Sequence, residues 1–147
     1  MSDLIIMSCS KTKKHLENIA AMELYDGQAY RIIRKISPEN LDILILSAKY
    51  GLIRPTDIIS YYDQAMTVAR AAEIRDHVEN TIRGFVRYHN TGRIFISLGF
   101  PYNLAISGGF LHFLDDGFNL QVASGPIGKR LHQLKEWLEP LKVEAPR

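Results

Sequence analysis

The chain has little of what several classes of protein require. It contains one cysteine, Cys9, which excludes an internal disulfide and any zinc site built mainly from cysteines. No apolar run approaches the roughly 18 residues that a membrane-spanning helix needs. The N-terminus has no secretory pattern, because Asp3 precedes a very short apolar stretch that runs directly into SCSK. We therefore expect a cytoplasmic protein.

Strong charge and metal-ligand motifs are also missing. The formal net charge is +2, which is too small to indicate strong nonspecific binding of nucleic acid but would not repel a phosphate-bearing ligand. The five histidines show no HExxH or other close ligand spacing, so no metal site is predicted. Nothing in the sequence suggests a cofactor. The length of 147 residues suits a single domain, 1–147, with a disordered tail at about 140–147.

Four short apolar runs predict β-strands. Two of them, LIIM and ILIL, are continuous rather than alternating, which is typical of strands covered on both faces of a parallel sheet. The predicted strands are residues 4–7, 43–46, 94–97 and 120–123.

Helical patterns lie between these runs. Three-to-four spacing of apolar residues predicts a long helix over 68–88, with Thr67 as its N-cap. Shorter helices are predicted over 28–36 and 126–138, the latter with Pro126 in its first turn. Gly108 and Gly109 would interrupt a helix, so no secondary structure is predicted for the segment 102–118. The alternation predicts an α/β fold of three layers. It has a mainly parallel sheet of about four strands and helices on both faces, as in Rossmann-like or flavodoxin-like proteins.

Polar residues follow each predicted strand. The carboxyl ends of parallel strands share one edge of a sheet, where such folds bind ligands. We therefore expect one ligand site formed by four loops, with these candidate residues: Ser8, Cys9, Ser10, Lys11 and Lys13; Ser47, Lys49 and Tyr50; Gly99 and Tyr102; Gly125 and Lys129.

The first loop has the chemistry of an anion site. Its serine hydroxyls can donate hydrogen bonds and its lysines supply positive charge, although the GxxxxGK[ST] pattern of a Walker A loop is absent. Cys9 could be a nucleophile if neighbouring cations lower its pKa. It could instead be a small buried hydrophobic residue, as free cysteine often is.

The later loops carry similar alternatives. Lys49 could bind a phosphate or carboxylate and Tyr50 could stack on a base, or the loop could be a turn in which Gly51 has a positive φ. Asp63 is a candidate general base or ribose anchor, and otherwise an Asx turn or helix cap. Gly125 opens a helix whose N-terminus could bind an anion. Lys129 and Arg130 there oppose the helix dipole, which indicates either an anionic ligand or solvated charges.

Five stretches together resemble a known family. SCSKTK, ELYDGQAYR, ILSAKYGLI, YYDQAM and SGPIGKRLHQLKEWL resemble a small uncharacterised bacterial and phage domain family with SCSxxK, LYxG and LSAKYG motifs. The peroxide-stress protein family related to YaaA and the core domain of archaeosine synthase look like distant relatives. The resemblance implies chemistry on nucleic acid or modified nucleobases, and it assigns Tyr25 and Gly27 to the shared pattern without giving any residue a role. Ser8 stands where the archaeosine signature has proline.

Two classes of function follow from these residues. The first is an enzyme acting on a nucleotide, a nucleobase or a modified base in nucleic acid, with transfer or hydrolysis at an N-glycosidic bond as the expected reaction. The loop 8–13 would then hold phosphate, Lys49 would neutralise developing charge, and Asp63 would be the general base. Tyr50 or Tyr102 would stack on the base. The alternative is a non-catalytic nucleic-acid-binding, stress-related protein or a sensor of free nucleotide.

Overall fold

The computed structural model describes residues 1–142 and has a five-stranded sheet at its centre. The strand order is β4-β3-β1-β6-β7. The strands β1 (Ser2–Ser8), β3 (Leu41–Ser47), β6 (Thr91–Ser97) and β7 (Asn119–Val122) run parallel, and β4 (Gly51–Ile53) pairs antiparallel with β3. The prediction of an α/β fold with a mainly parallel sheet is confirmed.

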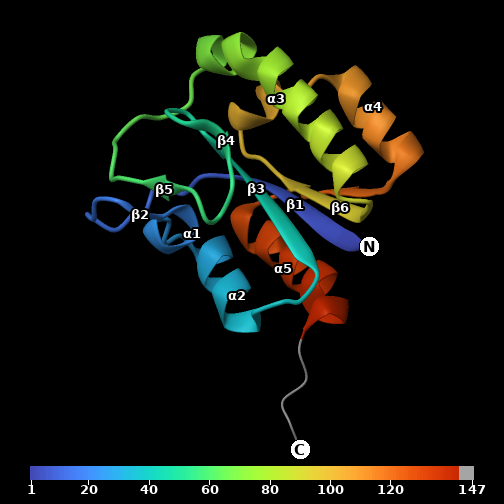
Figure 1. Cartoon of the computed structure of the whole chain (residues 1–147), viewed down its shortest axis with the longest axis horizontal. Coiled ribbons are helices and arrows are strands. Elements are labelled where there is room, and N and C mark those ends of the chain that lie inside the picture. Colours follow the sequence, from blue (N-terminus) through green and yellow to red (C-terminus); the bar gives the residue numbers. More distant parts are fainter. Residues whose placement is uncertain (143–147) are drawn as a thin grey trace, which may run out of the picture.

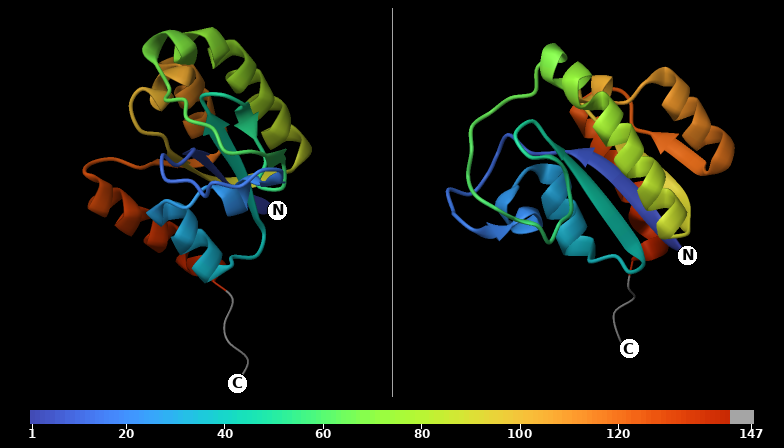
Figure 2. Two further views of the ribbon diagram at one scale, coloured as in Figure 1. Left: turned by 90° about the vertical axis from the view of Figure 1, so that its left-hand side faces the viewer. Right: turned by 45° about the horizontal axis from the view of Figure 1, so that its top comes forward.

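Helices cover both faces of this sheet and make the molecule three-layered (Figures 1 and 2). On one face lie α3 (Val68–Tyr88), a 3₁₀ helix (Tyr102–Ala105) and α4 (Gly108–Gly117). On the other lie α1 (Ala21–Leu24), α2 (Gln28–Ile36) and α5 (Ile127–Leu138). Among residues 1–142, no helix is both long and apolar enough to cross a bilayer.

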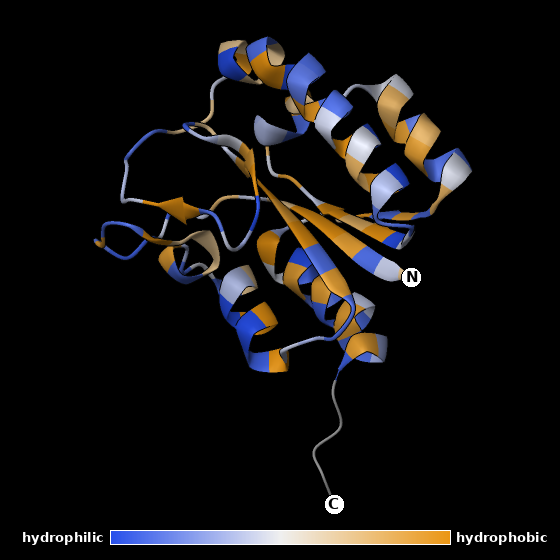
Figure 3. Cartoon of the chain, viewed as in Figure 1, coloured by the Kyte–Doolittle hydropathy of each residue, from blue (hydrophilic) through white to orange (hydrophobic). Residues whose placement is uncertain are grey.

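The central parts of β1, β3 and β6 are apolar (Figure 3), and they are buried on both sides. In β1, Leu4 and Ile6 belong to the core beneath α3 and α4, whereas Ile5 and Met7 belong to the core beneath α2 and α5. Successive residues of a strand point to opposite faces, so a continuous apolar run supplies both cores. The burial expected from LIIM and ILIL is therefore confirmed.

Helix boundaries agree closely with the predictions. The helices expected over 28–36 and 68–88 are α2 and α3 with those limits, and Thr67 Oγ1 accepts a hydrogen bond from the Arg70 backbone N–H at 3.1 Å. In α5, Pro126 is the N-cap rather than a first-turn residue. A 3₁₀ turn, Glu139–Leu141, occupies the start of the segment expected to be a tail, and 143–147 lie outside the described residues.

Several elements go beyond the sequence prediction. The turn at Gly51, where φ is +76°, leads into β4, which adds an antiparallel strand beside β3. The two glycines at 108 and 109 begin α4 instead of interrupting it, because Ser107 caps the helix by accepting from the Phe110 N–H at 3.1 Å. A separate two-stranded ribbon pairs β2 (Ile19–Ala20) with β5 (Ile58–Ile59).

The topology makes a crevice between β1 and β6. The chain leaves β1 through α1 and α2 on one face to reach β3, whereas it leaves β6 through α4 on the other face to reach β7. The connections therefore leave these two neighbouring strands on opposite faces of the sheet. The gap between β1 and β6 is the topological switch point of the sheet. Open α/β sheets bind ligands at the carboxyl ends of strands at such a switch point.

Candidate functional site

A cavity of about 390 Å³ lies at this switch point. The ends of β1 and β6 form part of its wall, and the first turns of α2 and α5 close the sides. Four of the residues predicted from the sequence line it: Ser8, Cys9, Ser10 and Gly99. A cavity of this size suits a small organic ligand such as a nucleotide.

Two helix N-termini face the cavity without side-chain caps. The N-cap residues are Gly27 in α2 and Pro126 in α5, and neither helix has a side-chain hydrogen bond at its cap. Their first N–H groups remain available, and such groups together with the helix dipole attract anions. Gly27 is required for close approach, because a Cβ there would collide with Ser10 Oγ.

Arg130 adds a positive charge to the same wall. A Cβ placed on Gly99 would lie 3.7 Å from Arg130 Nη1, so the guanidinium group lies beside the end of β6. The Arg130 Nε atom is buried and has no hydrogen-bond partner among residues 1–142. Burying an unpaired charged donor is costly, and an anionic ligand would remove that cost.

A chain of three hydroxyl groups lies on the β3 side of the cavity. Tyr62 Oη is 2.7 Å from Tyr25 Oη and 2.8 Å from Ser47 Oγ. Ser47 Oγ also accepts from two backbone N–H groups, those of Lys49 and Tyr50, at 3.2 and 3.1 Å.

These bonds fix the direction at one end of the chain. A hydroxyl oxygen accepts two hydrogen bonds, so Ser47 must donate its own hydrogen to Tyr62. Between Tyr62 and Tyr25 either hydroxyl can be the donor.

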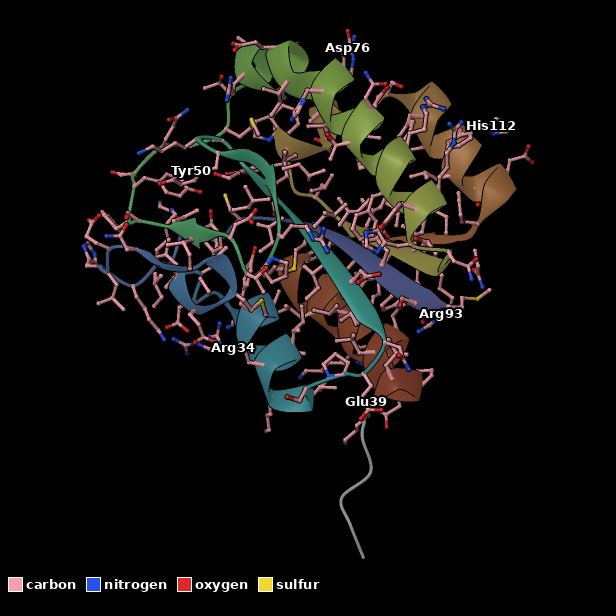
Figure 4. The ribbon with its side chains drawn as sticks, in the orientation of Figure 1. Arg34, Glu39, Tyr50, Asp76, Arg93 and His112 are labelled. Atoms are coloured by element: carbon pink, nitrogen blue, oxygen red, sulfur yellow. The ribbon has the colours of Figure 1, made fainter. Side chains whose placement is uncertain are left out.

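Two predicted lysines from different loops lie over these tyrosines. Lys13 Nζ is 4.6 Å from the Tyr62 ring centroid, and Lys49 Nζ is 6.0 Å from the same centroid. Lys49 Nζ also lies 5.3 Å from the Tyr50 ring, which Figure 4 labels near β5. These are cation–π distances. The first and second loops therefore meet, as the sequence predicted for parallel strands.

Cys9 lies between the cavity and a neighbouring tyrosine, Tyr102. It lines the cavity, and its Sγ is 3.2 Å from Tyr102 Oη. Burial raises the pKa of Tyr25 to about 12, with a smaller contribution from the nearby Cys9. Burial, followed by the Cys9 group, also raises the pKa of Tyr62 and Tyr102 above the ordinary value. All three phenols are therefore neutral near pH 7 and can act as hydrogen-bond donors.

Four predicted residues neither line the cavity nor contact the tyrosines beside it. Lys11 is exposed, and its carbonyl accepts from Lys13 Nζ at 3.4 Å. Asp63 is exposed next to Tyr62 and makes no hydrogen bond or ion pair with residues 1–142. Gly125 and Lys129 are exposed at the start of α5, where Gly125 has a φ of +90°.

Sequence reasoning gave no site role to three tyrosines. Tyr62 and Tyr25 form the hydroxyl chain, and Tyr30 Oη donates to the Ser8 carbonyl at 2.8 Å, which holds the end of β1. The stretch LYDGQAY, which places Tyr25 and Tyr30 on either side of Gly27, could have indicated this role. The hydroxyl of a buried tyrosine usually needs a hydrogen-bond partner. Arg130 had been noted only because its charge opposes the α5 dipole.

Comparison with known proteins identifies a family but no characterised relative. Residues 4–136 match the family of unknown function DUF6884. No significant match was found among curated proteins or among solved structures.

Proposed function

The chain belongs to the family of unknown function DUF6884, and we propose a function from its own residues: an enzyme that binds a nucleotide unit in the cavity between β1 and β6. The phosphate would lie between the N-termini of α2 and α5, and the reacting part would extend toward Cys9 and Tyr102. The earlier resemblance to the peroxide-stress and archaeosine synthase families supports nucleotide chemistry.

The buried Arg130 Nε is the single observation that carries this proposal. A guanidinium group that has an unpaired buried N–H and lies beside two uncapped helix N-termini has the donors that bind phosphate. Ser8 and Ser10 lie on the same wall and add hydroxyl donors. The convergence of helix N–H groups, hydroxyls and arginine favours a phosphate over an uncharged ligand.

The favoured reaction is transfer or hydrolysis at an N-glycosidic bond. In the hydrolysis, the C1′–N bond breaks and its electron pair goes to the base nitrogen, which takes up a proton. The oxygen of water bonds to C1′ and loses a proton. Neutral Tyr102 is suited to stabilise the departing base as a hydrogen-bond donor, and Lys49 would offset developing negative charge. Asp63 remains the proposed general base, and Cys9 the alternative nucleophile.

A nucleotide sensor is the second candidate. No carboxylate of residues 1–142 lines the cavity, and Asp63 is exposed outside it. Glycosidic cleavage usually needs a carboxylate near the reacting bond, so this feature favours binding without turnover. A non-catalytic, stress-related protein that binds nucleic acid would use the same donors.

Calorimetric titration with nucleoside monophosphates and the matching nucleosides tests the proposal. We expect a monophosphate to bind more tightly than its nucleoside. Arg130→Gln should weaken binding of the monophosphate by roughly 10- to 100-fold, because a hydrogen bond to a charged group contributes about 1.5–3 kcal/mol. Arg75→Gln, an exposed arginine on α3 across the sheet, is the matched control.

Equal affinity of wild type and Arg130→Gln would overturn the phosphate site. If a monophosphate binds, chromatography of the ligand after incubation separates the enzyme from the sensor. Free base that is released by the wild type but not by Lys49→Ala identifies an enzyme. Tight binding with no product identifies a sensor.

A further inference from the structure

A second cavity of about 370 Å³ lies between α2 and α5, beyond the first along both helices. Ile32 and Ile36 form its apolar part. Its polar lining comprises Arg31, Lys35, Lys135, Lys142 and Glu139. We call this cavity the basic groove. The two helices contact each other and lie side by side in Figure 1 and in the left-hand view of Figure 2.

The basic groove carries uncompensated positive charge. Arg31 pairs with Asp26 at 2.9 Å, which neutralises one cation. Lys35, Lys135 and Lys142 form no ion pair with any residue in the part of the chain that is described, and Glu139 is the one carboxylate in the lining. The helix dipole accounts for Lys35 and Lys135, which lie in the last turns of α2 and α5. The dipole does not account for Lys142, which lies beyond the end of α5.

The groove lies next to the first cavity along the same two helices. Gln28 lines the first cavity, and Ile32 and Lys35 line the groove four and seven residues later on α2. At about 1.5 Å per residue this offset is roughly 6–10 Å along the helix. On α5, Leu131 lines the first cavity and Lys135 lines the groove one turn later. A ligand longer than one nucleotide that follows the two helices from the first cavity would therefore reach the groove.

We propose that the substrate is a nucleotide within a single-stranded nucleic acid, whose adjoining phosphates lie in the basic groove. This inference rests on the proposed function, because the reacting nucleotide occupies the first cavity. A free mononucleotide would leave the groove cations without a partner. Linked phosphates continue the anionic ligand chemistry of the first cavity, and a positively charged groove is the feature with which proteins track a single-stranded backbone. A duplex would first have to extrude the reacting nucleotide.

Fluorescence anisotropy with a short labelled single-stranded oligonucleotide tests the groove. The double variant Lys35→Gln/Lys135→Gln should bind the oligonucleotide at least about 10-fold more weakly than wild type at low salt. Removing two phosphate contacts should also reduce the salt slope of binding by about 1.4. Calorimetry should give a mononucleotide affinity within about twofold of wild type, because neither lysine lines the first cavity.

The matched control is Arg75→Gln/Arg87→Gln, which removes two exposed charges from α3 on the opposite face. Both substituted lysines are exposed, and circular dichroism checks that each variant folds. The proposal is overturned if groove and control variants bind the oligonucleotide equally, or if only duplex or an acidic peptide competes. If mononucleotide binding is absent but oligonucleotide binding depends on the groove, the proposed function fails and the groove remains a nucleic-acid surface.

Discussion

At the scale of single residues, Tyr62 is the connecting member of the buried hydroxyl chain. Its hydroxyl accepts from Ser47 and is hydrogen-bonded to the Tyr25 hydroxyl, and both neighbours are fully buried. Tyr62→Phe removes both bonds and leaves the Ser47 hydrogen without an acceptor. We expect a loss of about 1–3 kcal/mol in the free energy of unfolding, the cost of a buried unsatisfied polar group. Urea denaturation measures this loss.

Tyr88→Phe is the control for that substitution, because Tyr88 is 86% exposed at the end of α3. It should change stability by less than about 0.5 kcal/mol. Equal effects of the two substitutions would show that the hydroxyl chain contributes nothing to stability.

At the scale of elements, α3 depends on its N-terminal cap. Thr67 Oγ1 accepts from the Arg70 N–H, and the helix supplies six buried residues to one core. Thr67→Ala leaves this N–H without its side-chain partner, so the free energy of unfolding should fall by about 1 kcal/mol. Thermal unfolding of Thr67→Ala and of the exposed-site control Thr56→Ala checks this, and a larger effect of Thr56→Ala would contradict it.

At the scale of the whole molecule, the buried tyrosines make stability depend on alkaline pH. The Tyr25 pKa is raised from 10.0 to about 12, mainly by burial, so the folded chain retains a proton that the unfolded chain releases. This contribution to stability is complete below pH 10.0 and is lost as the pH rises through about 12. The raised pKa values of Tyr62 and Tyr102 act in the same direction.

Urea denaturation across that range should show the free energy of unfolding decreasing with pH. Tyr25→Phe should have a shallower decrease than wild type, whereas exposed Tyr88→Phe should retain the wild-type slope. A wild-type profile that is flat above pH 10.0 would mean that these phenols ionise freely in the folded state.

Local patterns in the sequence predicted most elements of the fold. The limits of α2 and α3 follow from the three-to-four spacing of their apolar residues, and the parallel sheet follows from continuous apolar strands. The strand β4 and the helix α4 were not predicted. The three residues of β4 are too few to show a period, and the cap that begins α4 at Gly108 overrides the low helix propensity of glycine.

The sequence by itself determined that Ser8, Cys9, Ser10 and Gly99 would meet, because the carboxyl ends of parallel strands share one edge. Only the tertiary structure decided that Tyr25 and Tyr62, 37 residues apart, would join one hydroxyl chain, and that Arg130 would lie beside Gly99 with its Nε atom buried. The physical reason is that residue spacing reports which face of its own element a side chain occupies. Contacts between elements depend on how the helices pack against the sheet, which no local period encodes.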